Sequence, residues 1–169
     1  MELNELLLRT AFACMACDGD IAPEEVQLIK VFAKDSNTFG DIDVDKELDI
    51  LLKDINAKGK RFLKEYLSQV YNSTLNEQEE LQLLNVAVKM ILADNVIEYS
   101  EIKFFKVIRS NLKVVNNDTI LEKVDGITED FLAEDIRADH LQLYDDYFEN
   151  IEIPKFDLNE FNNSVKSSS

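Results

Sequence analysis

Two short acidic stretches contain the side chains in this sequence that are best suited to binding a ligand. The first reads Asp-Gly-Asp-Ile-Ala-Pro-Glu-Glu over residues 18–25, and the second reads Asp-Asn-Val-Ile-Glu-Tyr-Ser-Glu over residues 94–101. Carboxylate oxygens suit hard divalent cations such as calcium and magnesium. The candidate metal ligands are therefore the acidic residues of both stretches: Asp18, Asp20, Glu24, Glu25, Asp94, Glu98 and Glu101.

The two acidic stretches belong to an internal duplication. A shift of 76 residues places the second stretch on the first and also aligns the apolar positions on either side. Gly19 falls on Asn95, and these two residue types most readily adopt the left-handed backbone that ends a helix. We expect Ile21 and Ile97 to enter the core after each turn. The duplication predicts two helix–acidic turn–helix hairpins related by a pseudo-twofold axis, and a joint metal site requires their turns to meet.

The elements that position these turns are predicted to be helices. Apolar residues recur at helical spacing, and glycine (4) and proline (2) are scarce among the 169 residues, so the fold class is all-α. Pro23 suits the first position of a helix, and Thr74 or Asn76 can cap another. The expected helices span residues 2–17, 23 to the turn cluster at 37–40, 43–55, 58–72, the cap at 74 or 76 to about 93, 99–112 and 117–124.

The first acidic stretch, with the apolar and alanine-rich helix before it, resembles the Asp-Gly-Asp-Ile-x-x-x-Glu signature of the TerB-like (tellurite-resistance protein B) family. The likeness covers roughly residues 1–115. The second copy departs from the motif, since Asn95 and Val96 replace the glycine and the second acidic residue. The resemblance implies a compact helical domain with acidic clusters near its inter-helix turns. It also implies a non-enzymatic role in tellurite resistance or stress response, through metal binding or docking on membrane-associated or stress-complex proteins.

Residues 116–169 lie outside the resemblance and are predicted to form an acidic helical extension. Between residues 120 and 152 there are eleven acidic and two basic residues, interspersed with aromatic and aliphatic ones. An acidic helix with one apolar face usually packs on its own domain, although it could present that face to a partner. Ile153-Pro154 ends any helix, and the final serines are expected to fray.

The net charge of −16 limits the classes of partner. So negative a protein repels nucleic acid and anionic membrane surfaces, and it favours cations or a protein with a basic patch. No uncharged apolar run approaches the roughly 18 residues of a membrane helix. The first residues show neither a basic leader nor a cleavage pattern, so we expect a cytoplasmic protein.

The remaining reactive residues do not indicate an enzyme. Cys14 and Cys17 lie in a helical pattern among small apolar residues, which favours a place in the core. A zinc site needs further ligands, and His140 is the only histidine. The sequence offers no phosphate-binding glycine loop and no nucleophile with a nearby base. We therefore assign no catalytic residue.

The acidic stretches have two further interpretations. Asp18 and Glu25 match positions five and twelve of an EF-hand loop, but positions one and three would then be Cys14 and Ala16, which do not bind calcium. Met90 and Leu92 exclude the second copy in the same way.

The other interpretation is structural. Asp18 and Asp94 would cap, Gly19 and Asn95 would turn, and Glu24, Glu25 and Glu101 would stabilise helix dipoles. The sequence thus predicts a binding module that holds a divalent cation at its acidic turns, with a metal-free adaptor docking on a basic partner as the alternative.

Overall fold

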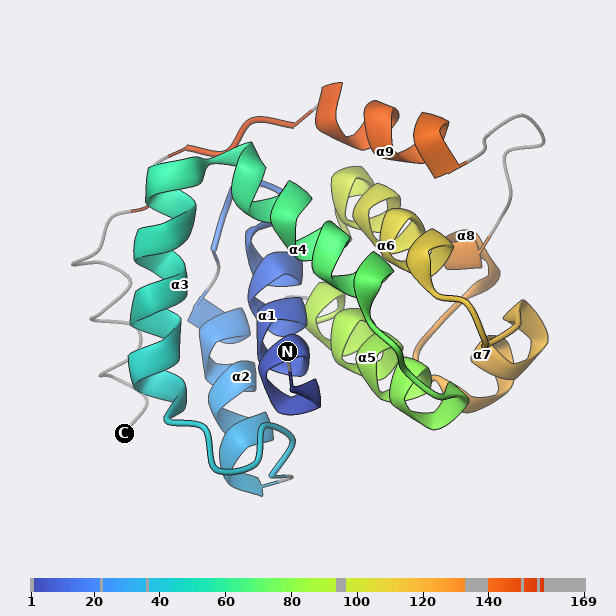
Figure 1. Cartoon of the computed structure of the whole chain (residues 1–169), viewed down its shortest axis with the longest axis horizontal. Helices are drawn as coiled ribbons and strands as arrows, with labels where there is room; N and C mark the ends of the chain where they lie inside the picture. Colours follow the sequence, from blue (N-terminus) through green and yellow to red (C-terminus); the bar gives the residue numbers. More distant parts are fainter. Residues whose placement is uncertain are drawn as a thin grey trace.

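The computed structural model describes residues 2–21, 23–35, 37–93, 97–132, 140–149, 151–154 and 156. These residues form an all-helical fold (Figure 1), as predicted. Its helices are α1 (Leu3–Ala16), α2 (Pro23–Asp35), α3 (Val44–Lys58), α4 (Lys60–Asn72), α5 (Glu77–Ile91), α6 (Tyr99–Asn111), α7 (Asn117–Lys123), α8 (Glu129–Leu132) and α9 (His140–Glu149).

Local signals determine where these helices begin. Asn76 is the N-cap of α5: its side chain accepts the Glu79 N–H at 2.8 Å, and the Glu79 carboxylate accepts the Asn76 N–H at 3.0 Å. This reciprocal pair satisfies two of the donors that a helix start leaves free. Pro23 opens α2, as the sequence predicts. The helices predicted up to residue 124 are present with ends that agree within a few residues.

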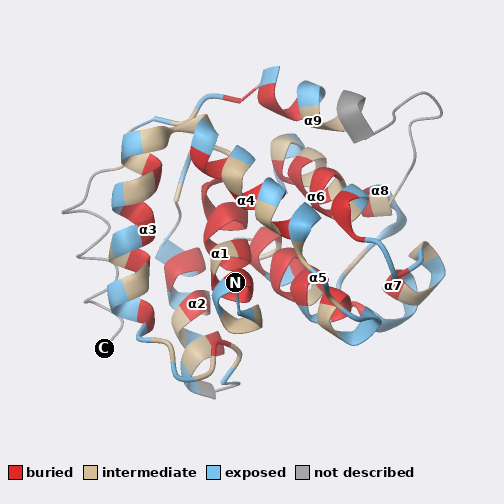
Figure 2. Ribbon diagram, viewed as in Figure 1, coloured by how far each residue is buried: buried red, intermediate tan, exposed pale blue. Residues whose placement is uncertain are grey.

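The duplicated segments pack against each other at the centre of the molecule. Helix α1 packs against α5, its counterpart in the second copy, and each contacts the second helix of the other hairpin, α6 and α2. Figure 2 shows buried residues along almost the whole of α1, whereas exposed and buried residues alternate along α3. This cross-packing is what a twofold relation between the hairpins requires; the axis itself stays a prediction.

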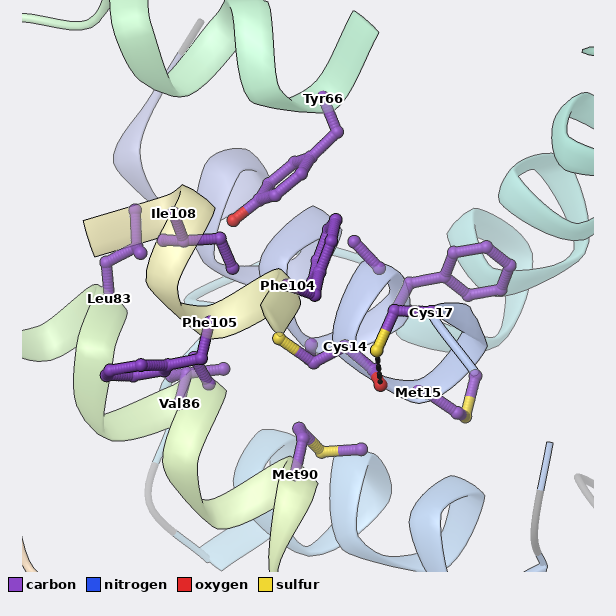
Figure 3. Close-up of a cluster of buried hydrophobic side chains, with 14 of the residues drawn as sticks. Cys14, Met15, Cys17, Tyr66, Leu83, Val86, Met90, Phe104, Phe105 and Ile108 are labelled. Atoms are coloured by element: carbon purple, nitrogen blue, oxygen red, sulfur yellow. Dashed lines mark hydrogen bonds between the residues drawn. The ribbon is translucent and has the colours of Figure 1, made fainter. Parts of the chain in front are cut away.

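Cys14 and Cys17 lie in the core, which confirms their predicted place. Both are free thiols with no exposed surface, and the Cys17 thiol donates to the Cys14 carbonyl at 3.1 Å (Figure 3). The same region holds Met90 of α5 and Phe104 of α6. The end of α1 is therefore buried by both hairpins.

The C-terminal extension packs on the body through short helices. Helices α8 and α9 both contact α6, and Lys103 of α6 pairs with Asp146 of α9 at 3.2 Å. The extension is less regular than one acidic helix would be, because α8 covers a single turn and α9 ends at Glu149. Aromatic residues anchor it, with Phe131 and Tyr147 each only 1% exposed.

Residues 151–154 and 156 form an extended segment after α9, here called the strap (Figure 1). The Asn56 side chain binds both backbone groups of Phe156: its Oδ1 accepts the N–H at 2.8 Å and its Nδ2 donates to the carbonyl at 3.0 Å. Lys60 donates to the Phe148 carbonyl at 2.9 Å. Asn56 thereby fixes the strap to α3, and Lys60 fixes the end of α9 to the start of α4. Within the described ranges, no helix has the length and apolar character required to cross a bilayer.

Candidate functional site

The first acidic turn ends α1 at Gly19. This glycine has a φ of +85°, in the left-handed region that side chains disfavour, and its N–H donates to the Ala16 carbonyl at 3.0 Å. The Asp18 carboxylate accepts the Asp20 N–H at 2.9 Å and so closes the turn. The predicted role of Gly19 is confirmed. The expectation that Asp18 caps the next helix is replaced by a bond within the turn itself.

The strap crosses this first turn. A Cβ built on Gly19 would lie 2.6 Å from the Glu152 carbonyl oxygen and 3.5 Å from Cδ of Pro154. Beside this crossing is a surface cleft of about 550 Å³, lined by Asp18, Gly19, Lys60, Glu152, Ile153 and Pro154. Glycine is therefore required here twice, for its backbone angle and for the space that the strap occupies.

Asp18 lies in an environment that disfavours its charge. Burial raises its pKa to about 6 from a usual value of 3.8, an effect that the Asp20 N–H opposes and the charges of Asp20 and Glu98 increase. Since Glu98 belongs to the second acidic stretch, the two turns lie close enough to interact electrostatically. A joint site requires the turns to meet, and this electrostatic interaction between Asp18 and Glu98 is consistent with that prediction.

Glu101 stabilises the start of α6. It is 3% exposed, and its Oε1 accepts the Glu98 N–H at 2.9 Å. The structural interpretation of Glu101 is confirmed and refined, because the carboxylate bonds a backbone donor rather than only facing the helix dipole. Glu25 occupies the equivalent position in α2 and is likewise buried, at 4% exposed. Both copies therefore keep a buried glutamate in the first turn of their second helix.

The two buried glutamates act on the same pair of thiols. Burial is the main cause that raises the pKa of Cys14 well above its usual value, and the charges of Glu101 and Glu25 raise it further. Cys17 is shifted in the same direction by burial, Cys14, Glu101, Asp18 and Glu25. The acidic turns thus converge on the end of α1. The thiols there remain protonated, so they are poor nucleophiles and poor metal ligands.

The predicted metal ligands are brought together only in part. Asp18 interacts electrostatically with Glu98, and Glu25 and Glu101 both act on the cysteines, whereas Asp20 and Glu24 are exposed. Asp94 lies outside the described residues. Among the side chains that are described, no three carboxylate, thiol or imidazole groups form a cluster that could hold a metal ion. Metal binding by the seven predicted ligands therefore stays a prediction.

Ile97 corrects one expectation about the second turn. It is 44% exposed, whereas Ile21 is partly buried against the core, so only the first copy places its isoleucine as predicted. Tyr99 beside it is 70% exposed, with the Lys103 ammonium 4.5 Å from its ring centre. The second turn thus presents two large apolar side chains next to Glu98.

Glu80 was not identified from the sequence. It is 3% exposed, and its carboxylate accepts the N–H groups of Lys113, Val114 and Val115 at 2.8–3.0 Å. It ties the first turn of α5 to the link between α6 and α7. The sequence signal was only an acidic residue in the first turn of a helix, which gives no indication of a partner more than thirty residues away.

No family model matches the chain, and no curated protein or solved structure shows detectable similarity to it. The likeness to TerB-like proteins therefore rests on the motif residues alone.

Proposed function

We propose that this chain is a non-enzymatic binding module whose acidic turns dock on a basic segment of a partner protein. The observation that supports this is a set of carboxylates without cationic partners at the converging turns. The ion pairs of the described residues involve α2–α3, α3–α4 and α6–α9, and none includes Asp18, Asp20 or Glu98. Such a concentration of negative charge attracts a positively charged ligand and speeds its association.

The exposed apolar residues of the second turn favour a protein as that ligand. Ile97 and Tyr99 flank the exposed Glu98, and aromatic residues next to polar ones are typical of protein interfaces. A metal ion binds oxygen atoms and would make no favourable contact with these apolar side chains.

The second candidate is a divalent cation, calcium or magnesium, at the same turns. The raised pKa of Asp18 favours it, since a bound cation would relieve the repulsion from Asp20 and Glu98. In this proposal Asp94 completes the ligand set, because the described carboxylates do not form a three-ligand cluster. Both candidates are compatible with a TerB-like role in stress response and a cytoplasmic location, which we propose from the sequence motif and composition.

A three-way comparison tests the proposal. The full chain is compared with the variant Asp20→Asn/Glu24→Gln/Glu98→Gln and with the control Glu122→Gln/Asp125→Asn/Glu129→Gln. The two variants remove equal numbers of exposed charges. Each is titrated with an amphipathic peptide rich in lysine and leucine at several salt concentrations. We expect salt-sensitive binding that the first variant loses and the control keeps. Equal binding by all three proteins would contradict docking at the turns.

The cation candidate is tested separately by thermal unfolding. A ligand that binds only the native state raises the unfolding midpoint with its concentration. If calcium or magnesium raises the midpoint above matched ionic strength, and Asp18→Asn/Asp94→Asn abolishes the rise, the turns hold an ion. If neither ion does, the cation candidate fails and docking on a basic protein is left.

A further inference from the structure

We infer that the strap is a removable cover on the first acidic turn, an inference that rests on the proposed function because it concerns the same docking surface. The strap lies directly over the turn. The Glu152 carbonyl oxygen is 2.6 Å, and Cδ of Pro154 is 3.5 Å, from the position that a Cβ on Gly19 would take. Gly19 stands between Asp18 and Asp20 in the chain. A ligand that contacts the turn on this face must therefore displace the strap.

The strap is held mainly at its two ends. At the near end, Ile151 is buried and only 6% exposed. At the far end, the Asn56 side chain binds both backbone groups of Phe156, at 2.8 and 3.0 Å, a pair here called the clasp. Ile153 packs against the core, but residues 152–154 form no hydrogen bond or ion pair in the described part of the chain. Opening of the clasp therefore frees the strap while α9 stays in place.

The strap covers the turn without neutralising its charge. Glu152 is the one charged residue at its described positions, and Lys155 lies outside them. Lys60 lines the cleft beside the crossing and offsets part of this charge, although its ammonium donates to the backbone at the end of α9 at 2.9 Å. Asp18 and Asp20 therefore keep an excess of negative charge around them. A basic partner supplies positive charge that the described strap residues lack, so electrostatics favours the partner.

The cleft beside the crossing allows the partner a first contact. It encloses about 550 Å³, and its lining includes Asp18 of the turn with Ile153 and Pro154 of the strap. A basic side chain can therefore reach the turn while the strap is still in place, and the rest of the segment binds as the strap leaves. A site that is covered in most molecules binds its ligand more weakly, in proportion to the open fraction. Opening the clasp should therefore raise the apparent affinity.

A substitution in the clasp tests this in the full chain. Asn56→Ala removes both hydrogen bonds to Phe156. Asn85→Ala is the matched control, since Asn85 is also partly buried but its amide donates to the Leu81 carbonyl of its own helix at 3.1 Å. Each protein is titrated with the lysine–leucine peptide that tests the acidic turns. We expect Asn56→Ala to bind the peptide about fivefold tighter or more, and Asn85→Ala to bind it like the full chain.

Hydrogen exchange in the unsubstituted chain gives a second readout. The Phe156 N–H is bonded to Asn56 Oδ1 when the strap is in place. A saturating concentration of the peptide should speed amide exchange at residues 151–156 and leave that of α3 unchanged. Unchanged or slower exchange at residues 151–156 would mean that the strap stays on the turn when the peptide binds, and it would overturn the inference.

Two results separate the cover from the docking proposal. Equal or weaker binding by Asn56→Ala, with binding still lost in Asp20→Asn/Glu24→Gln/Glu98→Gln, would overturn the cover and leave docking at the turns standing. If Asn56→Ala keeps its gain in affinity when those three charges are also removed, the peptide binds elsewhere and both proposals fail. Both also fail if neither the full chain nor Asn56→Ala binds the peptide. Circular dichroism verifies that each variant folds, and the exchange experiment decides the question if Asn56→Ala does not.

Discussion

Tyr147 of α9 donates its hydroxyl to the backbone carbonyl of Cys17 at 2.6 Å, although 130 residues separate them. The tyrosine is 1% exposed, and its ring lies against Phe104 with centres 5.0 Å apart. One side chain thus joins the extension to the end of α1, next to the first acidic turn.

Replacing Tyr147 with phenylalanine tests this connection. The ring contacts persist, but the Cys17 carbonyl loses a buried donor, which costs about 1–3 kcal/mol when a group is left unsatisfied. We expect a lower midpoint in urea unfolding. Tyr71→Phe, at a half-exposed position, should have little effect. Equal midpoints for the two variants would show that the hydroxyl contributes nothing.

Gly19→Ala should loosen the strap. Alanine at a φ of +85° costs about 1–2 kcal/mol in backbone strain, and its Cβ meets the Glu152 carbonyl. Gly59→Ala is the matched control, since Gly59 also has a positive φ, +60°, with nothing within 4 Å of the added carbon. Hydrogen exchange should show faster exchange at residues 151–156 in Gly19→Ala only. Similar exchange in both variants would mean that strain, not the strap contact, dominates.

Asp18→Asn should stabilise the chain in a pH-dependent manner. The folded pKa of about 6 exceeds the unfolded value of 3.8, so the folded state binds more protons between these pH values. The free energy of unfolding therefore falls as the pH rises from about 4 to about 6. Asparagine keeps the acceptor for the Asp20 N–H but carries no charge next to Asp20 and Glu98. We expect a gain of about 1–2 kcal/mol at pH 7.5, after allowance for solvent screening, and almost none at pH 4.

The measurement is thermal unfolding of both proteins across this pH range in metal-free buffer. A stability difference that is constant with pH would exclude Asp18 as the titrating group. Glu24→Gln is the control, since Glu24 is exposed and is not among the groups that shift the pKa of Asp18.

Glu80→Gln should destabilise the link between α6 and α7. The carboxylate accepts three successive backbone N–H groups with two oxygens, whereas glutamine offers one oxygen and a repelling NH₂. A loss of about 1–3 kcal/mol is expected. Glu77→Gln, exposed in the same helical turn, should cost only a few tenths of a kcal/mol. Equal losses of unfolding free energy in the two variants would mean that Glu80 stabilises only the helix dipole.

The features predicted from the sequence were those that neighbouring residues determine. Asn76 as a helix cap, which the sequence offered as an alternative to Thr74, Pro23 at a helix start and Gly19 at a helix end each depend on a few adjacent positions. Glu80 and Asn56 could not be recognised in this way, because their roles depend on groups that are distant in sequence. Ile21 and Ile97 show the limit of a repeat argument. Their sequence contexts match, yet one contacts the core and the other faces solvent.

The duplication also predicted the same backbone conformation for both turns. It did not show which distant segments pack on each turn. The strap crosses the first turn at Gly19, and nothing in residues 18–25 indicates that residues 152–154 will lie over them. The acidic stretches could therefore be found as candidates, but their exposure could not be predicted.

The strap has a consequence for synthesis of the chain. Translation delivers α1 first, yet Cys17 and Gly19 receive their covering groups only when residues 147–156 have left the ribosome. Until then the nascent hairpins lack the tyrosine and the strap that complete the end of α1. Incompletely covered apolar surface is what chaperones bind and what drives aggregation. A ribosome stalled before residue 147 would therefore leave the end of α1 without this cover.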